Sequence, residues 1–211
     1  MSYENNKQSY ISKFLSLKCS GDVLNIVNPI NNAEKEISES MAIIKRLKSI
    51  ILERPRYYNI IDLCAGNALT SIIAIHLLPI TTAIAVDKLP RDRNWGAVHR
   101  FSYLYQNIHE TLTESLINDR TILISSHPCK NARRVVELYR STPAAAMILI
   151  PCCEGSLKNK YPQLIHEKLG HYLTWCYDLA IDCGGNMIVD SKILSPKNCV
   201  IVDRKDNHER K

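Results

Sequence analysis

Short apolar runs alternate along most of the chain with longer stretches whose apolar residues recur at helical spacing. The apolar runs are rich in β-branched residues and predict strands at 60–63, 83–86, 101–105, 121–125 and 145–150. The longer stretches predict helices at 37–51, 69–78, 109–118, 132–140 and 162–182. Strands that are apolar throughout are typical of a parallel sheet covered on both faces, and the strand–helix alternation predicts an α/β fold.

The segment before the first strand is expected to be a helical extension, residues 1–56, that packs on the core. Residues 10–17 predict a short helix, and residues 23–27 predict a short strand or extended piece. Asn31, with Glu34 three residues later, resembles a capping box at the start of the following helix. We expect that helix to end before Pro55, because the residue before a proline disfavours helical geometry.

The C-terminal part of the chain predicts a helix followed by an antiparallel hairpin. The helix at 162–182 carries one apolar face, made by Leu169, Tyr172, Leu173, Cys176 and Leu179. Gly184 and Gly185 provide its end, since glycine tolerates left-handed geometry. Runs at 187–194 and 198–202 flank a turn sequence, which predicts the hairpin. The main domain is therefore expected at 57–205, followed by a charged tail at 206–211.

Composition adds three constraints to this picture. At 211 residues the chain is long enough for one sizeable domain with a full core. Its net charge of +6 suits a polyanionic partner, although many soluble enzymes carry such a charge. The eight cysteines fall mostly in apolar runs, the N-terminus lacks the apolar segment of a signal peptide, and no apolar run reaches membrane-span length. These features predict free thiols and a cytoplasmic location without membrane contact.

Candidate ligand-binding residues follow the first three strands, where ligands bind in open α/β sheets. The turn after the first strand contains Gly66, which lets a ligand approach the backbone, and it leads into a helix N-terminus. A phosphate and the carboxylate of an amino acid both fit such a turn, and a simple connection does too. Asp87 closes the second strand and can accept ribose hydroxyls, or it serves as a rim charge. Asn107 can read an adenine edge or stabilise a turn.

A second group follows the fourth and fifth strands, whose ends should lie beside the first strand. It contains His127 and Cys129 after the fourth strand, and Cys152, Cys153 and Glu154 after the fifth. The group fits a zinc site, a nucleophilic cysteine, or a pocket wall shaped by prolines and thiols. Adjacent cysteines are poor spacing for zinc, so we expect the pocket wall and no metal. His127 is a candidate general base in this wall, or a structural histidine.

Basic residues surround a tryptophan in the loop after the second strand. The loop contains Arg91, Arg93, Trp95 and Arg100, and Lys158 and Lys160 lie in a later loop. Cations attract phosphates, and an aromatic ring can stack on an unpaired base. The loop therefore favours RNA binding, with a solvated surface loop as the alternative.

Together these motifs resemble the class I S-adenosylmethionine-dependent methyltransferases. The resemblance rests on Asp62–Gly66, on Ala85–Asp87, on a polar motif after the fourth strand and on the terminal hairpin, and covers roughly residues 57–205. More narrowly, Ser125–Cys129 followed by Leu149–Cys153 is similar to the family that contains the acceptor-stem tRNA 2′-O-methyltransferases. Cys64 and Ala68 stand where that family has glycines in its cofactor turn.

The resemblance implies a Rossmann-like seven-stranded methyltransferase sheet, mostly parallel with an antiparallel C-terminal hairpin, and S-adenosylmethionine as cofactor. The implied cofactor-binding residues are Asp62, Cys64, Ala65, Gly66, Asn67, Asp87, Lys88, Asn107 and Ser126. The implied catalytic residues are His127, Cys129 and Glu154. The implied substrate-binding residues are Arg91, Arg93, Trp95, Arg100, Cys152 and Cys153. The expected substrate is RNA, most simply tRNA. A small-molecule or protein methyltransferase and a non-catalytic partner subunit of the same fold are the alternatives.

Overall fold

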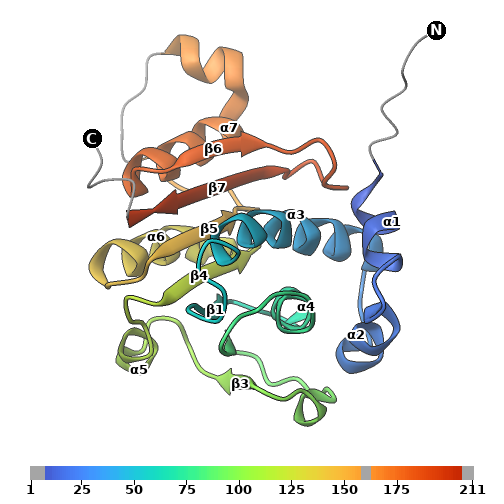
Figure 1. Cartoon of the computed structure of the whole chain (residues 1–211). Helices are drawn as coiled ribbons and strands as arrows, with labels where there is room; N and C mark the ends of the chain where they lie inside the picture. Colours follow the sequence, from blue (N-terminus) through green and yellow to red (C-terminus); the bar gives the residue numbers. More distant parts are fainter. Residues whose placement is uncertain (1–7, 158–162, 206–211) are drawn as a thin grey trace, which may run out of the picture.

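The computed structural model describes residues 8–157 and 163–205, so Lys158, Lys160 and the tail at 206–211 lie outside the described residues. A seven-stranded sheet with the order β3-β2-β1-β4-β5-β7-β6 forms its centre (Figure 1). The strands are β1 Asn59–Leu63, β2 Ala83–Asp87, β3 Phe101–Tyr105, β4 Thr121–Ser126, β5 Ala146–Ile150, β6 Asn186–Val189 and β7 Cys199–Arg204. Strands β1 to β5 run parallel, and β7 pairs antiparallel with both β5 and β6. The predicted mostly parallel sheet with an antiparallel C-terminal hairpin is confirmed.

Helices cover both faces of this sheet (Figure 1). One face carries α1 Tyr10–Leu15, α2 Ser20–Val27, α3 Ala33–Ile51 and α4 Leu69–Leu77. The other face carries α5 Thr111–Ser115, α6 Ala132–Ser141 and α7 Gln163–Cys183. Two short 3₁₀ helices, η1 Trp95–Ala97 and η2 Cys129–Asn131, lie in loops. Within the described chain, each helix is too short or too polar to cross a membrane.

The apolar strands divide their side chains between two cores. In β1, Ile60 packs in the cluster under α3 and α4, and Ile61 packs in the cluster under α6 and α7. In the neighbouring β4, Ile122 and Leu123 divide in the same way. Burying each of these side chains stabilises the fold by roughly 1.5–3 kcal/mol. A polar side chain buried inside β1 to β5 therefore needs a hydrogen-bond partner. For this reason, the polar side chains at the strand ends indicate where a functional site lies.

Residues 23–27, predicted as a strand or extended piece, are part of helix α2 instead. The side chains of Val23, Ile26 and Val27 are spaced by three and four residues and are buried in the same cluster. That spacing is helical, and the pattern was too short to separate it from a strand. The N-cap of helix α3 is Asn32, one residue after the predicted cap Asn31, and it has a left-handed backbone and no side-chain capping bond.

Two differences between the structure and the sequence prediction concern the C-terminal part of the chain. Helix α7 has a non-helical residue at Gly170, with φ 70° and ψ 169°, and the preceding Leu169, expected on the apolar face, is exposed. Strand β6 ends at Val189, earlier than predicted, because the carboxylate and carbonyl of Asp190 accept hydrogen bonds from the backbone of Lys192 and Ile193. These bonds form a turn in place of further strand pairing.

A buried polar cluster ties the N-terminal helices to the segment after β6. The hydroxyl of Tyr10 donates to Asp190 at 2.6 Å, and the guanidinium of Arg46 lies 2.6 Å from the same carboxylate oxygen. Burial by itself raises the pKa of Asp190, but the hydrogen bonds from Tyr10 and Arg46 outweigh it and lower the pKa. Nearby, the backbone N–H of Leu194 donates to the hydroxyl of Ser38 in α3. Helix α3 is thus anchored from both ends of the chain.

We expect Asp190→Asn to lower the free energy of unfolding by about 3 kcal/mol, because it leaves a buried guanidinium without its carboxylate. Only 10 % of the Arg46 side chain is exposed. Urea unfolding at neutral pH measures the change. The matched control is Glu114→Gln, which removes a surface ion pair with Arg134 and should change the stability by about 0.5 kcal/mol. Equal effects of the two substitutions would contradict the assigned role of Asp190.

Candidate functional site

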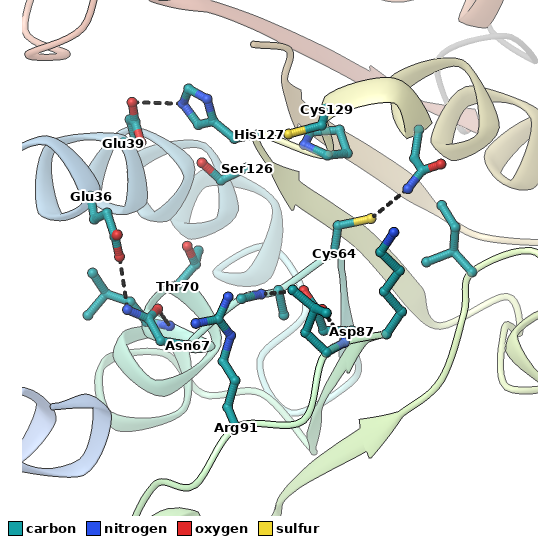
Figure 2. A pocket seen from close by; sticks show the side chains of 18 of the residues that line it. Glu36, Glu39, Cys64, Asn67, Thr70, Asp87, Arg91, Ser126, His127 and Cys129 are labelled. Atoms are coloured by element: carbon teal, nitrogen blue, oxygen red, sulfur yellow. Dashed lines mark hydrogen bonds and ion pairs between the residues drawn. The ribbon is translucent and has the colours of Figure 1, made fainter. Parts of the chain in front are cut away.

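A cavity of about 640 Å³ opens at the carboxyl ends of the parallel strands (Figure 2). From β1 the chain proceeds to β2 and β3 on one side, and it then returns to β4 on the other side of β1. Such a switch in strand order is where open α/β sheets bind ligands. The lining comes from α3, from the start of α4 and from the loops after β1 to β4: Lys35, Glu36, Glu39, Ser40, Cys64, Ala65, Gly66, Asn67, Leu69, Thr70, Asp87, Lys88, Leu89, Arg91, Asn107, Ile108, Ser126, His127, Pro128, Cys129, Lys130 and Asn131.

The carboxylate of Asp87 joins two of these loops. One of its oxygens accepts the backbone N–H of Gly66 at 2.8 Å, and the other accepts the backbone N–H of Leu89 at 2.9 Å. The side chain is 9 % exposed and faces the cavity. Each carboxylate oxygen has a second lone pair, so both remain able to accept a hydroxyl proton of a ligand.

The turn after β1 keeps a left-handed backbone although it has a single glycine. The φ angles are 58° at Cys64, 57° at Gly66 and 61° at Ala68. A residue with a Cβ pays roughly 1–2 kcal/mol for this conformation, so Cys64 and Ala68 hold a strained shape that glycine would adopt freely. A Cβ added at Gly66 would meet no atom within 4 Å, so its backbone faces open space. The path of the chain is that of a glycine-rich turn.

Helix α3 contacts this turn from the N-terminal side. The amide of Asn67 donates to the carboxylate of Glu36 at 2.9 Å, and its oxygen accepts the backbone N–H of Leu69 at 3.1 Å. Burial raises the pKa of Glu36, and the bond from Asn67 opposes that rise. The start of α4 is thereby fixed against α3.

His127 faces a carboxylate that also comes from α3 (Figure 2). Its Nε2 lies 2.7 Å from Oε1 of Glu39, whose side chain is 3 % exposed. Neither atom has a hydrogen-bond partner of good geometry, so the contact is a close approach of ring and carboxylate rather than a directed hydrogen bond. The backbone φ of His127 is 55°, and its N–H donates to the carbonyl of Ile150 at 2.9 Å. The imidazole is thus held at the cavity wall by its neighbours.

The predicted site residues divide into those that line the cavity and those that do not. The lining includes Cys64, Ala65, Gly66, Asn67, Asp87, Lys88, Arg91, Asn107, Ser126, His127 and Cys129. Outside the lining lie Asp62, Arg93, Trp95, Arg100, Cys152, Cys153 and Glu154. Asn107 is exposed, and its side-chain oxygen accepts the backbone N–H of His109, which leaves its amide N–H groups to donate.

Most of the predicted RNA-binding loop is engaged with its own chain. Arg93 donates to the backbone carbonyls of Val27, at the end of α2, and of Pro29, and Arg100 donates to carbonyls between α4 and β2. Trp95 stacks on Tyr103 with ring centroids 3.8 Å apart. These side chains therefore shape the fold, and Arg91 is the residue of this predicted set that reaches the cavity.

The residues after β5 stand at the border of the cavity. The sulfur of Cys152 lies 3.7 Å from that of Cys129, which is a lining residue. Glu154 is exposed, and its carboxylate pairs with Lys197 at 2.8 Å and with His171 at 2.9 Å. The hydrogen bond from Lys197 is the main cause of its lowered pKa.

Helix α3 supplies lining residues that the motif search did not identify: Lys35, Glu36, Glu39 and Ser40. A signal for them was present in the sequence. Glu36 and Ser40 are one helical turn apart, and both lie beside the apolar stripe that begins at Ile37. Acidic and hydroxyl side chains at the edge of a buried stripe indicate a polar cavity next to the core.

Comparisons with known proteins agree on the fold alone. No protein-family model matches the sequence, and no curated protein matches it. MtNAS in complex with MTA and tNA has a TM-score of 0.53 and 12 % identity, covering 92 % of this chain and 67 % of its own. Thermoplasma acidophilum protein 1320 has a TM-score of 0.50 and 10 % identity, and the match covers 88 % of this chain and 96 % of that protein. An O-methyltransferase family protein from Burkholderia thailandensis has a TM-score of 0.46 and 13 % identity, and the match covers 92 % of this chain and 71 % of that protein. These likenesses and the sheet order show a Rossmann-like α/β fold.

Asp62 makes the stability of the protein depend on pH. It is buried in β1, where Ser71 donates to it at 2.8 Å, and burial raises its pKa to about 7. Because this value lies above that of an unfolded aspartate, about 3.9, the folded state binds more protons between the two, and stability falls as pH rises through this window.

We expect Asp62→Asn to abolish the fall in stability that the wild-type protein shows as the pH rises. The stability of the variant relative to wild type should grow between about pH 4 and 7, on the order of a few kcal/mol, and then level off. Urea unfolding at a series of pH values measures the difference. Asp92→Asn, at an exposed position, is the control and should show a constant difference. A flat profile for Asp62→Asn would mean that this carboxyl titrates normally.

Proposed function

We propose that this protein is an S-adenosylmethionine-dependent methyltransferase. The observation that carries the proposal is the carboxylate of Asp87, which ends β2 and holds the Gly66 turn open toward the cavity. A cavity of 640 Å³ lies within the usual size of small-ligand sites. This cavity lies at the switch in strand order, where open α/β sheets bind ligands.

The cavity residues fit the three parts of this donor. The turn at Ala65 and Gly66, followed by the start of α4, would hold the amino-acid part, because its backbone lines the cavity and no side chain at Gly66 blocks the approach of a ligand. Asp87 would accept the ribose hydroxyls. The amide of Asn107 and the apolar side chain of Ile108 would contact the adenine. When bound, S-adenosylmethionine supplies an electrophilic methyl group on a sulfonium.

His127 and Glu39 supply the proton chemistry in this proposal. In a neutral ring protonated at Nε2, the nitrogen nearest Glu39, Nδ1 would be left to accept a proton from an acceptor hydroxyl or amine. The carboxylate of Glu39, 2.7 Å from Nε2, would keep the imidazole in place for this step. Positioning the acceptor is the other contribution of the cavity wall, since methyl transfer is a displacement that requires alignment.

RNA is the acceptor class that we propose, with tRNA as the first substrate to test. The cavity is lined by four cationic side chains, Lys35, Lys88, Arg91 and Lys130, which suit a phosphate backbone, and the whole chain is basic. A small-molecule or protein acceptor is the second candidate. It is favoured by the contacts that tie Arg93, Trp95 and Arg100 to the rest of the fold.

Calorimetric titration with S-adenosylmethionine tests the donor site. We expect binding to the wild-type protein, and binding roughly 10-fold to 100-fold weaker with Asp87→Ala, because hydrogen bonds to a carboxylate are lost. The control is Asp92→Ala, an exposed aspartate on the same loop outside the cavity lining, which should bind like wild type. No heat from a folded wild-type protein would reject the proposed function and leave a non-catalytic role for the fold.

Transfer of a labelled methyl group to total tRNA tests the acceptor and the proposed base. We expect His127→Asn to lower kcat roughly 100-fold or more, with donor affinity nearly unchanged. Glu39→Gln should lower kcat by a smaller factor, because the ring loses a charged partner and keeps its place. The control is Glu34→Gln, an exposed position on the same helix. Label in protein or small molecules alone would reject RNA as the acceptor, and weakened donor binding in His127→Asn would reject the proposed division of roles.

A further inference from the structure

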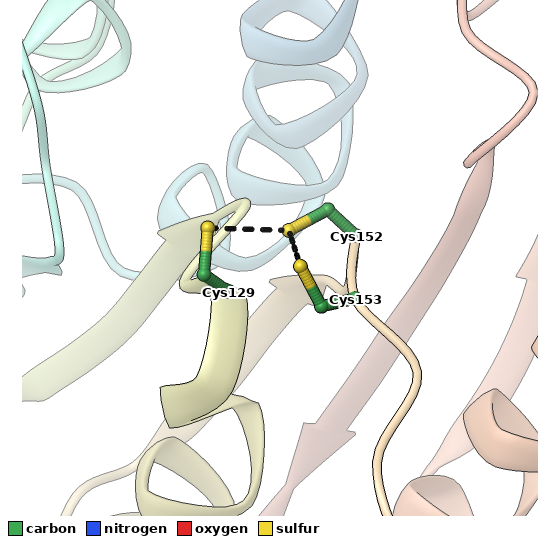
Figure 3. A group of neighbouring side chains, drawn as sticks. All are labelled: Cys129, Cys152 and Cys153. Atoms are coloured by element: carbon green, nitrogen blue, oxygen red, sulfur yellow. Dashed lines mark hydrogen bonds between the residues drawn. The ribbon is translucent and has the colours of Figure 1, made fainter.

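Three cysteine side chains converge where the loops after β4 and β5 meet (Figure 3). The sulfur of Cys152 lies 3.7 Å from that of Cys129 and 3.5 Å from that of Cys153, and all three sulfurs lie within 4.8 Å of one another. Cys129 and Cys153 are exposed, and Cys152 is half-buried. The cluster is therefore open to solvent and to ions.

The backbone holds these thiols in place from both sides. Cys129 begins η2 with a φ of 52°, a left-handed conformation that a cysteine adopts only under constraint. The N–H of His127 donates to the carbonyl of Ile150, which joins the ends of β4 and β5. The hydroxyl of Tyr172 in α7 donates to the carbonyl of Pro151 at 2.9 Å, just before the cysteine pair. Two loops far apart in the sequence thus present their sulfurs to one point.

We propose that Cys129, Cys152 and Cys153 bind a zinc ion. Four ligands at a Zn–S distance of about 2.3 Å place tetrahedral sulfurs about 3.8 Å apart. The two shorter separations in the cluster are already close to that value, and small rotations of the exposed thiols close the third. The adjacent spacing of Cys152 and Cys153 counts against zinc only if a pair must form the site by itself, and here Cys129 completes it.

A disulfide is the other chemistry open to these thiols, and it explains less of the arrangement. A bond between Cys129 and Cys152 would use two sulfurs and leave the third without a role. Three sulfurs around one point match a metal ion, and on binding each thiol releases its proton to solvent. Among the described residues, no fourth histidine, cysteine or carboxylate joins the group, so a solvent molecule would take the remaining position.

This zinc site goes beyond the proposed methyl transfer. The ion would lie at the border of the cavity, because Cys129 is part of the cavity lining. It would fix the loop that carries His127 against the loop after β5. Zinc binding is measured without any methyl donor, so its failure would leave the proposed function standing, and loss of donor binding would leave the zinc site standing.

The test uses the full-length protein, reduced and stripped of metal with a chelator. Zinc is added in competition with a chromophoric chelator, and cobalt(II) serves as a spectroscopic probe. We expect one zinc ion per chain and the visible bands of tetrahedral cobalt thiolate. Cys129→Ser and Cys153→Ser should each weaken zinc binding roughly 100-fold. The control is Cys19→Ser, which removes a thiol outside the cluster and should bind zinc like wild type.

A second measurement needs no substitution. Zinc should slow alkylation of Cys129, Cys152 and Cys153 in the wild-type protein, as followed by mass spectrometry, and should leave the rate at Cys19 unchanged. The proposal is overturned if folded wild type binds no zinc, if the serine variants bind it as tightly as wild type, or if the isolated protein contains a Cys129–Cys152 disulfide and no metal.

Discussion

The hydrogen bonds of the Asp87 carboxylate hold the candidate site together. This single side chain fixes the turn after β1 through Gly66 and the loop after β2 through Leu89. The backbone N–H of Ala65 also donates to the carbonyl of Val86, so the two loops are joined twice. The same carboxylate oxygens face the cavity and can accept ligand hydroxyls. Its structural role and its proposed ligand-binding role therefore act through the same atoms, and the backbone bonds would orient the group before any ligand arrives.

Helix α3 adds two carboxylates to the lining of the cavity. The sheet contributes backbone N–H groups and the Asp87 carboxylate, whereas α3 contributes Glu36 against the turn and Glu39 against His127. These two carboxylates are one helical turn apart on a helix whose other face packs in the core. The donor side and the proposed base are thus positioned by the same rigid element. The strain of this turn is opposed by packing: Ala68 is buried in the cluster under α3 and α4, and Cys64 packs against the cluster under α6 and α7.

The sequence predicted the parts of the fold that depend on burial. Strand β3 has the expected bounds, and β1, β2, β4 and β5 differ by a residue or so, because strands buried on both faces leave continuous apolar runs. The ends of these strands then located the cavity. The partners of charged side chains could not be predicted in this way. Arg93 and Arg100 looked free for RNA but bind backbone carbonyls, and Glu39 reaches His127 across 88 positions of sequence through packing alone.

The anchoring of α3 also sets the order in which the site can assemble. The helix that carries Glu39 is held at Ser38 by the backbone of Leu194 and at Arg46 by Asp190, and β7 completes the sheet still later in the chain. The donor-side loops, by contrast, are built from residues before 110. A chain emerging from the ribosome can therefore form the Asp87 turn early, while the wall that positions His127 becomes fixed only after synthesis reaches the last strand. The two walls of the candidate cavity would therefore form at different stages of synthesis.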